Sequence, residues 1–386
     1  MIQRSRKVII FGAGELGGIV AELLARHPSF CGQIVLADIN AELALRRANS
    51  AQQGALQWDS HTIVTAECID LRNLDQTATL LRNIEPDVIL NATTMATWWL
   101  RDLLPEAVKK RLHVVGAGSG VWSASHAALA YHLMLAVRES GIVATVMNSA
   151  YPDAVNPALA AAGLAPDIGI GNGDLLVPAL KQVAAQHFGV AAHRVGIVLV
   201  AHHFHAYNVL MYGHSHGLDF PVRISIDGRD VTDAIGREAA LAAVPVKAGI
   251  PAAAAATWIV AASAVRILLA MLDPVGRLIH APGPLGLVGG YPLQVGGGEV
   301  RLALPEGIDH DAAIAINWKA QRAEGIETIE ADGTIVLTDV ASGTLKEVFG
   351  YDCKRYPLKD CLAIANETAG ALRSLGAKHG VLLHTH

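Results

Sequence analysis

The sequence predicts an α/β protein, with a doubly wound parallel sheet in residues 1–150 followed by a second domain of the α+β kind. Short apolar strands alternate with amphipathic helices through the first 150 residues, which is the pattern of a parallel sheet with crossover helices. This alternation stops after Pro152, where alanine-rich helices and glycine- and proline-rich turns follow. With 386 residues, the chain is also longer than a single core usually grows, which favours two domains.

The elements of the predicted sheet follow one another along the chain. A buried strand at Lys7–Phe11 leads through a glycine turn into a helix whose apolar side chains share one face. The second strand ends at Asp38, and a turn that carries Asp70 follows the third strand. The fourth strand spans Asp87–Asn91. The remaining elements are two strands and the helix between them, expected within 111–118, 141–150 and 123–140.

The second domain, placed at 151–345, is expected to mix helices and strands. An apolar strand at 195–203 and a strand at 220–228 precede alanine-rich helices that end at Leu272. Glycine and proline predict turns for 281–298. The other expected elements are a helix at 174–188, a helix that begins near Asp309, and a hairpin at 326–339. The last segment, 346–386, carries a helix that is expected to return to the first domain.

The composition argues for a small-molecule partner. The net charge is −5, the hydrophobic fraction is 52% and the charged fraction is 17%. A chain without a basic run cannot neutralise many phosphates, which argues against binding to nucleic acid or to an anionic membrane surface. Its high apolar content provides for a large core and for an interface between copies, so a homo-oligomer such as a homodimer is expected.

The four cysteines are scattered without Cys-x-x-Cys spacing, and the chain runs from a short basic start directly into its first strand. A reduced, cytoplasmic protein is therefore expected. The segment Ile250–Leu272 is long enough to cross a bilayer. It contains Ser263, Arg266 and many alanines, which favours a buried or interface helix over a membrane span.

A glycine-rich turn follows the first strand and opens the first helix. Gly12, Gly14 and Gly17 form the pattern Gly-x-Gly-x-x-Gly, and Glu15 and Leu16 lie between the last two. Side chains in place of these glycines would block the tight turn or the approach of the backbone to a pyrophosphate, which then faces the helix N-terminus. The sequence therefore predicts a Rossmann domain that binds a dinucleotide.

Residues after the next strands complete the predicted cofactor site. Asp38 lies where a carboxylate can bind both hydroxyl groups of a ribose. Because a carboxylate repels a 2′-phosphate, NAD is the expected cofactor, while Arg46 and Arg47 leave NADP open. Asp70 either meets the adenine amino group or caps the following helix. The residues expected near the nicotinamide ribose are Asn91, Ala92 and Thr93.

The segments GAGELG, LADIN, CIDLRNLDQTATLL and PDVILNAT follow one another between Val8 and Thr93, and YPDAVNPALAAAG follows the predicted sheet. In this order they resemble the NAD(P)-binding domain of the saccharopine dehydrogenase-like oxidoreductases. The resemblance implies oxidation or reduction at a carbon that bears an amine or imine. It also implies a substrate domain inserted between the sheet and a returning C-terminal helix.

A second resemblance rests on NSAYPDAVN, GLAPDIGIGN, LKQVAAQHFGV and VGIVLVAHHFHAYNV. Their order and spacing are similar to those of lactate and malate dehydrogenases. This implies that His202 exchanges the proton and that Asn148 lies beside the nicotinamide. The arginine that binds the substrate carboxylate in those enzymes is missing, with Pro178 near its place, and the Glu and Asp beside their histidine are Ala201 and Phe204. The resemblance therefore does not extend to a 2-hydroxy acid substrate.

The stretch VAHHFHAYNVLMYGHSHG (200–217) is unusually rich in histidine. Hydride transfer needs a group that exchanges a proton at a pKa near neutral, which histidine provides without large tuning. The preceding apolar strand is expected to run into the cleft between the domains. The candidate proton-exchanging residues are therefore His202, His203 and His205, with Tyr151, Asp153 and Lys247 as the other candidates.

The same stretch leaves two other interpretations open. His203-x-His205 and His214-x-His216 would each present two imidazoles on one face of a strand, as a divalent metal requires. Asp219 could add a carboxylate. Alternatively, these histidines are polar residues of a loop or of a contact between subunits.

The sequence thus predicts an NAD(P)-dependent oxidoreductase that transfers hydride between the nicotinamide and a small polar substrate, an amino acid or imine, with a histidine as the acid–base group. One alternative is an enzyme that keeps NAD bound and performs transient oxidation followed by elimination, hydrolysis or group transfer, with or without a metal at the histidines. The other alternative is a dinucleotide-binding sensor without turnover.

Overall fold

The computed structural model describes residues 6–112, 114–251 and 253–383. Its largest sheet has six strands in the order β3-β2-β1-β4-β5-β6, and every neighbouring pair of strands is parallel. The predicted doubly wound α/β fold is confirmed, and the strand order reverses between β1 and β4. The strands are β1 (Arg6–Phe11), β2 (Gly32–Asp38), β3 (Ile63–Cys68), β4 (Val88–Asn91), β5 (Thr145–Asn148) and β6 (Ile168–Gly169).

The two faces of the sheet pack into two separate cores. Successive side chains of a strand point to opposite faces, so Val8 and Ile10 join one core while Ile9 and Phe11 join the other. Helices α1 (Glu15–Ala25) and α2 (Ala41–Gln57) cover the first face, and α3 (Leu74–Ile84) and α5 (Ser123–Ser140) cover the second. Burial on both faces explains why the strands are apolar throughout rather than alternating.

The strand predicted at 111–118 is wrong. Its described residues end helix α4 (Glu106–Leu112), form a turn, and open the 3-10 helix η2 (Gly118–Trp122). Gly116 and Gly118 have φ values of +93° and +31°, which an extended strand does not contain. The strand predicted within 141–150 is β5, and the sheet continues past residue 150 through α6 (Pro152–Ala161) to β6.

The chain after β6 adds three small antiparallel sheets. Their strands are β7 (Val195–Leu199), β8 (Val222–Ile226) and β9 (Arg229–Asp230); β10 (Arg277–Pro282), β11 (Gly290–Gly296) and β12 (Glu299–Leu302); and β13 (Ile326–Ile329), β14 (Ile335–Leu337) and β15 (Arg355–Tyr356). The prediction of turns across 281–298 is wrong for the end of β10 and for all of β11, which lie there, and holds for the turn that contains the 3-10 helix Pro284–Gly286. Tyr291 and Leu293 of β11 are fully buried, so these glycine-rich residues form a core strand.

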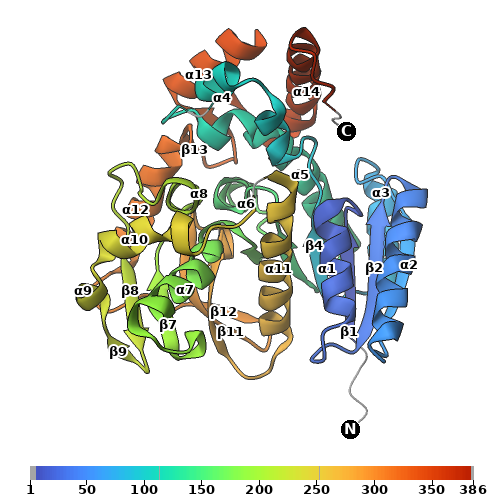
Figure 1. Cartoon of the computed structure of the whole chain (residues 1–386). Coiled ribbons are helices and arrows are strands. Elements are labelled where there is room, and N and C mark those ends of the chain that lie inside the picture. The colour runs from blue at the N-terminus through green and yellow to red at the C-terminus, as the bar shows by residue number, and fades with distance from the viewer. Residues whose placement is uncertain (1–5, 113, 252, 384–386) are drawn as a thin grey trace.

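Helices connect and cover these sheets. They are α7 (Leu176–Phe188), α8 (His203–Tyr212), α9 (Thr232–Ile235), α10 (Arg237–Lys247), α11 (Thr257–Leu272), α12 (His310–Ala323), α13 (Asp339–Thr344) and α14 (Cys361–Lys378). The helix α14 packs against α5, so the end of the chain lies on the first sheet's side of the molecule (Figure 1). The segment Ile326–Leu337 joins the same core as Ile9 and Phe11.

One helical segment, Ala254–Leu272, is long and apolar enough to cross a membrane by its length and composition, and half of it is buried inside the protein. The core of this segment is α11, which lies alongside α1 (Figure 1). Its buried side chains, such as Ile267 and Leu268, belong to the same core as Val8 and Ile10. The packing matches the expected buried helix.

Candidate active site

A cavity of about 1600 Å³ lies along the carboxyl ends of the central strands. It extends from the glycine turn to α8, and its lining comes from both halves of the chain. In doubly wound sheets, ligands bind at this edge near the point where the strand order reverses. The predicted cofactor residues that line the cavity are Gly12, Gly14, Glu15, Leu16, Asp38, Asp70, Ala92 and Thr93, and the predicted acid–base candidates that line it are Tyr151 and His203.

The glycine turn has the backbone geometry that its sequence predicts. Gly12 has a φ of +98°, and a Cβ atom there would lie 2.7 Å from the carbonyl oxygen of Ala92. A Cβ atom on Gly17 would lie 1.8 Å from the carbonyl oxygen of Gly12. Gly14 differs, since a Cβ atom there would meet nothing within 4 Å in the protein. The first and third glycines are therefore required by the fold, while the second leaves space open to the cavity.

Asp38 connects the glycine turn to the end of β2. One carboxylate oxygen accepts a hydrogen bond from the backbone N–H of Ala13 at 2.7 Å, and the other accepts one from Asn40 at 2.8 Å. These bonds fix the carboxylate at the cavity wall. Of the two arginines that leave NADP open, Arg46 is exposed and pairs with Glu42 at 2.6 Å, and Arg47 packs against Gly18.

Asp70 does not cap the helix that follows it. The N-cap of α3 is Asn73, whose side chain accepts a hydrogen bond from Gln76 N–H. Asp70 instead forms an ion pair with Arg72 at 2.7 Å, and the hydrogen bond from Arg72 lowers the pKa of the Asp70 carboxyl. The ion pair lies in the cavity wall, so the carboxylate is fixed there.

Three buried asparagines form a chain beneath the cavity. Asn91 Nδ2 donates to Asn148 Oδ1 at 2.9 Å, and Asn148 Nδ2 donates to Asn156 Oδ1 at 2.8 Å. Asn156 Nδ2 then donates to the carbonyl oxygen of Gly283. Thr93 donates to Asn91 Oδ1 at 2.6 Å, which places the Thr93 hydroxyl at the cavity wall. Asn91 and Asn148 are each only 1% exposed, so they position the wall rather than face a ligand.

The histidines after β7 are arranged differently from the prediction. The strand ends at Leu199, and α8 begins at His203 with His202 as its N-cap. His203 and His205 therefore lie in the first turn of a helix, where residues two apart do not share a face. His203 lines the cavity, whereas His202 and His205 are completely buried.

His202 has a fixed structural role. Its Nδ1 accepts a hydrogen bond from Phe204 N–H at 3.1 Å, so its Nε2 carries the hydrogen and donates it to Gln321 Oε1 at 2.7 Å. Gln321 Nε2 in turn donates to the hydroxyl of Tyr151 at 3.2 Å. Both ring nitrogens of His202 are used within the protein, so the proton-exchange role implied by the dehydrogenase resemblance does not fit this residue.

His205 is also unsuited to proton exchange. Its Nδ1 accepts a hydrogen bond from the backbone N–H of His202 at 3.1 Å, and its ring stacks on Phe220. Burial lowers the pKa of His205 to about 3. The imidazole therefore stays neutral at physiological pH and away from the cavity.

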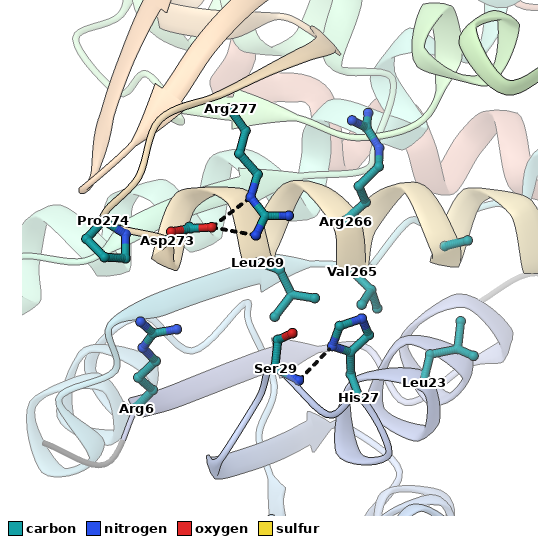
Figure 2. Close-up of a pocket in the computed structure, with 11 residues that line it drawn as sticks. Arg6, Leu23, His27, Ser29, Val265, Arg266, Leu269, Asp273, Pro274 and Arg277 are labelled. Atoms are coloured by element: carbon teal, nitrogen blue, oxygen red, sulfur yellow. Dashed lines mark hydrogen bonds and ion pairs between the residues drawn. The ribbon is translucent and has the colours of Figure 1, made fainter. Parts of the chain in front are cut away.

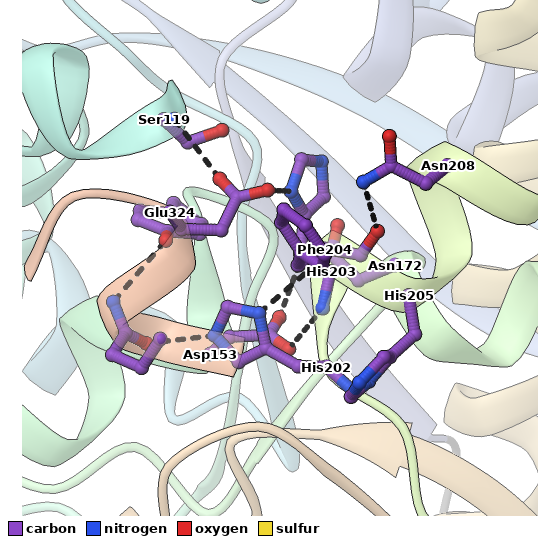
Figure 3. A network of polar contacts seen from close by, with 11 residues as sticks. Ser119, Asp153, Asn172, His202, His203, Phe204, His205, Asn208 and Glu324 are labelled. Atoms are coloured by element: carbon purple, nitrogen blue, oxygen red, sulfur yellow. Dashed lines mark hydrogen bonds and ion pairs between the residues drawn. The ribbon is translucent and has the colours of Figure 1, made fainter. Parts of the chain in front are cut away.

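His203 and Glu324 form the pair in the cavity wall that is best suited to proton exchange. Its Nδ1 lies 3.0 Å from Glu324 Oε1, and Glu324 also accepts a hydrogen bond from Ser119 N–H at 2.9 Å (Figure 3). Burial alone would raise the pKa of the Glu324 carboxyl, but the hydrogen bonds that it accepts from His203 and Ser119 contribute to lowering it. A carboxylate can only accept, so Nδ1 of His203 is the donor and Nε2 is the basic nitrogen of the neutral ring.

Asp153 and Tyr151 hold His203 from the other side. Asp153 is fully buried, and its carboxylate accepts hydrogen bonds from His203 N–H at 2.9 Å and from the Asn172 side chain (Figure 3). Tyr151 lies with its ring 5.8 Å from the His203 ring. Burial and the charges of Glu324 and Asp153 raise the pKa of the Tyr151 hydroxyl well above its usual value, so it stays protonated. Lys247, the remaining candidate, does not line the cavity.

The described residues give no support to the alternative of a metal site at the histidines. Among the residues that the structure describes, no group of three or more His, Cys, Asp or Glu side chains is arranged to hold a metal ion. The rings of His214 and His216 lie 4.4 Å apart on the turn after α8, but His203 is bonded to Glu324 and His205 is stacked on Phe220. Asp219 pairs with Arg237 at 3.0 Å instead of completing a site.

Sequence reasoning missed Ser119, Gln321 and Glu324. The two last residues come from the end of α12, more than a hundred positions after His203. Nothing in the local pattern QRAEGIE separates this glutamate from an exposed one. The one signal in the sequence is the glycine at position 325, because a glycine after a helix often marks a turn with positive φ. In the structure Gly325 has a φ of +102° and leaves no room for a Cβ atom beside Ala117.

A second cavity, of about 510 Å³, lies between α1 and α11 (Figure 2). The arginines that line this cavity bond to other groups of the protein. Arg6 donates to the carbonyl oxygen of Leu272 at 2.7 Å, Arg277 pairs with Asp273 at 2.5 Å, and Arg266 pairs with the buried Asp174. These contacts satisfy the C-terminal end of α11 and a buried charge, so the arginines here have structural roles.

Solved structures with the same overall fold are dehydrogenases. Malate dehydrogenase from Cryptosporidium parvum is 16% identical, with a TM-score of 0.59, over 83% of this chain and 98% of that one. Lactate dehydrogenase from the same organism, complexed with lactic acid and nicotinamide adenine dinucleotide, is also 16% identical, with a TM-score of 0.59, over 84% and 98%. Lactate dehydrogenase from Eimeria maxima, with NADH and oxamate, is 16% identical, with a TM-score of 0.57, over 96% and 97%.

These similarities establish the fold of nearly the whole chain. No protein-family model and no curated protein sequence matches it. The resemblance to lactate and malate dehydrogenases therefore has structural support, and the resemblance to the saccharopine dehydrogenase-like family has no such support.

Proposed function

We propose that this protein is an NAD-dependent oxidoreductase in which His203, oriented by Glu324, exchanges a proton with a small polar substrate. The observation that carries the proposal is the His203–Glu324 pair in the same cavity as the glycine turn. NADP remains the alternative cofactor. Two of the similar structures, the lactate dehydrogenases from Cryptosporidium parvum and Eimeria maxima, are complexes with nicotinamide adenine dinucleotide or NADH, which supports the choice of NAD.

The residues present fit a dinucleotide. Gly12 allows the tight turn, and the space at Gly14 lets a pyrophosphate approach the N-terminus of α1. Asp38 and Asp70 offer carboxylates for a ribose and an adenine amino group, and Ala92 and Thr93 lie at the nicotinamide end. When bound, NAD supplies the acceptor or donor of hydride.

The protein's own contribution is the proton. Neutral His203 has a basic Nε2, because Nδ1–H donates to Glu324. During oxidation this nitrogen takes the proton from a substrate hydroxyl or amine, and the negative charge of Glu324 stabilises the imidazolium that forms. During reduction the same nitrogen returns the proton. Asp153 fixes the start of α8, which keeps the ring in place.

The proposed substrate is an amine or its imine, and the charge around His203 supports this choice. Two buried carboxylates, Glu324 and Asp153, adjoin His203 and favour a reacting group that becomes cationic. A reaction in which NAD stays bound and is regenerated would use the same proton exchange. A sensor would use the glycine turn without the His203–Glu324 pair. The expected homodimer and cytoplasmic location stay predictions.

Replacement of His203 tests the proposal. In a panel of primary amines and alcohols, the wild-type protein is expected to form reduced nicotinamide stoichiometrically with product. His203→Gln should lower kcat/KM by about 100-fold or more while leaving NAD affinity within about twofold. His214→Gln, which changes an exposed histidine of the same stretch, is the matched control and should retain full activity.

Three outcomes would reject the proposal. Equal rates for His203→Gln and His214→Gln would show that His203 does not move the proton. Binding of NAD without turnover of any compound would favour the sensor, and product formation without accumulation of reduced nicotinamide would favour the bound-cofactor alternative. Glu324→Gln should shift the acid limb of the kcat/KM pH profile, a change that a purely structural role would not cause.

A further inference from the structure

The side of α8 that is not buried has an unusual composition. His203, Tyr207, Leu210 and Met211 are the residues from His203 to Met211 that are not fully buried, at the spacing of one helix face. A partly exposed helix face on a globular protein is normally polar. Here it is apolar apart from His203, and Met211 is 49% exposed.

This face borders the active-site cavity along its whole length. All four residues line the cavity that also contains the glycine turn. The Tyr207 ring stacks on the His203 ring, with centroids 6.1 Å apart and planes 24° apart. Eight residues of α-helix rise about 12 Å, so the apolar face extends about that far from the proton-exchanging histidine.

An opposing wall comes from the end of α10 and from the connection that follows it toward α11. Pro245, Ile250 and Pro251 line the same cavity, and Ile250 is 40% exposed. Helix α10 packs against α8, which holds the two walls together. Exposed apolar side chains gathered at a cavity mouth are typical of a ligand-binding groove.

The cavity is also larger than one ligand requires. Pockets for single drug-sized ligands usually measure about 300–1000 Å³, against about 1600 Å³ here. The glycine turn and the strand ends account for the dinucleotide. The volume along α8 is therefore available to a second molecule whose reacting group lies at His203.

We propose that the substrate carries an apolar substituent, aromatic or alkyl, that lies along Tyr207, Leu210 and Met211 while its amine or hydroxyl faces His203. This inference rests on the proposed function for the position of the reacting group. Apolar burial contributes about 0.8 kcal/mol per methylene, which corresponds to about a fourfold gain in affinity for each added CH₂. Met211 is then a specificity-determining residue at the far end of the groove.

The test is the equilibrium binding of n-alkylamines from propylamine to octylamine to the full-length protein saturated with NAD, measured by titration calorimetry. Affinity is expected to rise about fourfold per methylene until the chain fills the groove. Met211→Gln should reduce this gain for the longest amines by about tenfold. Leu45→Gln, a similarly exposed leucine on α2 that lies outside the cavity lining, is the matched control and should leave it unchanged.

The outcomes separate this inference from the proposed function. Affinity that does not change with chain length, or equal effects of Met211→Gln and Leu45→Gln, would overturn the groove. Length-dependent binding without reduced nicotinamide would support the groove and count against redox turnover. Turnover with a kcat/KM that is independent of substituent length would support the oxidoreductase and overturn the groove.

Discussion

The glycine turn and the His203–Glu324 pair lie in one cavity but are built in opposite ways. The turn is made by residues within a few positions of one another, and its geometry follows from the clash that a Cβ atom would meet at Gly12 or Gly17. The pair joins residues from α8 and from the end of α12, across antiparallel sheets that lie between them in the chain. A glycine turn can be recognised from local sequence, whereas the His203–Glu324 pair requires the assembled fold.

The largest effect on stability and on NAD binding is expected from a substitution in the glycine turn. Gly12→Ala places a Cβ atom 2.7 Å from Ala92 O at a φ of +98°, so we expect a loss of about 2 kcal/mol or more in the free energy of unfolding and no measurable NAD binding. Urea unfolding and NAD titration measure the two quantities.

Gly14→Ala is the matched comparison, because its Cβ atom meets nothing within 4 Å and its φ is −63°. Its unfolding free energy should stay within about 0.5 kcal/mol of wild type, while NAD binding weakens because the methyl group blocks the pyrophosphate. Equal destabilisation by both substitutions would contradict the distinction between a glycine that the fold requires and one that the ligand requires.

An intermediate effect, on the pH dependence of the unfolding free energy, is expected from His205, which is buried. The pKa of His205 is about 3 in the folded protein against 6.5 in the unfolded chain. Between these values the unfolded chain binds a proton that the folded one does not. Stability is therefore full above pH 6.5 and falls as the pH falls, by up to about 1.4 kcal/mol per pH unit.

His205→Gln removes this titration. Urea unfolding between pH 7.5 and pH 5 should show a shallower loss of stability for the variant than for wild type, although the variant is less stable at pH 7.5 because it loses the bond to His202 N–H. The exposed His214→Gln variant should keep the wild-type slope. A parallel pH dependence of His205→Gln and wild type would show that His205 is not neutral in the folded protein.

The smallest effect on unfolding free energy and on kcat/KM is expected from a substitution of Tyr151. Its hydroxyl accepts one hydrogen bond from Gln321, and its raised pKa keeps it protonated. Tyr151→Phe should cost about 1 kcal/mol of unfolding free energy and change kcat/KM less than about threefold, well below the effect of His203→Gln. A loss of activity as large as that of His203→Gln would transfer the proton-exchange role to the tyrosine.

The sequence predicted the first half well because its signals are local. The strand at Lys7–Phe11, the glycine turn and Asp38 each follow from a short pattern, and parallel pairing places them together. The same reasoning failed at 111–118, where positive φ values at Gly116 and Gly118 exclude a strand. It also failed at 281–298, where Tyr291 and Leu293 are buried in a strand despite the glycines around them.

By itself, the sequence determined the parallel sheet, the glycine turn and the stretch of chain that supplies the proposed proton-exchanging residue, because apolar periodicity and glycine spacing act over short distances. Only the tertiary structure decided which of these histidines lines the cavity, where it could exchange a proton with a substrate. His202 and His205 differ from His203 by one or two positions, yet the start of a helix buries them and turns His203 toward the cavity. Glu324 could not be chosen from sequence either, because its role depends on a contact with His203 that folding alone creates.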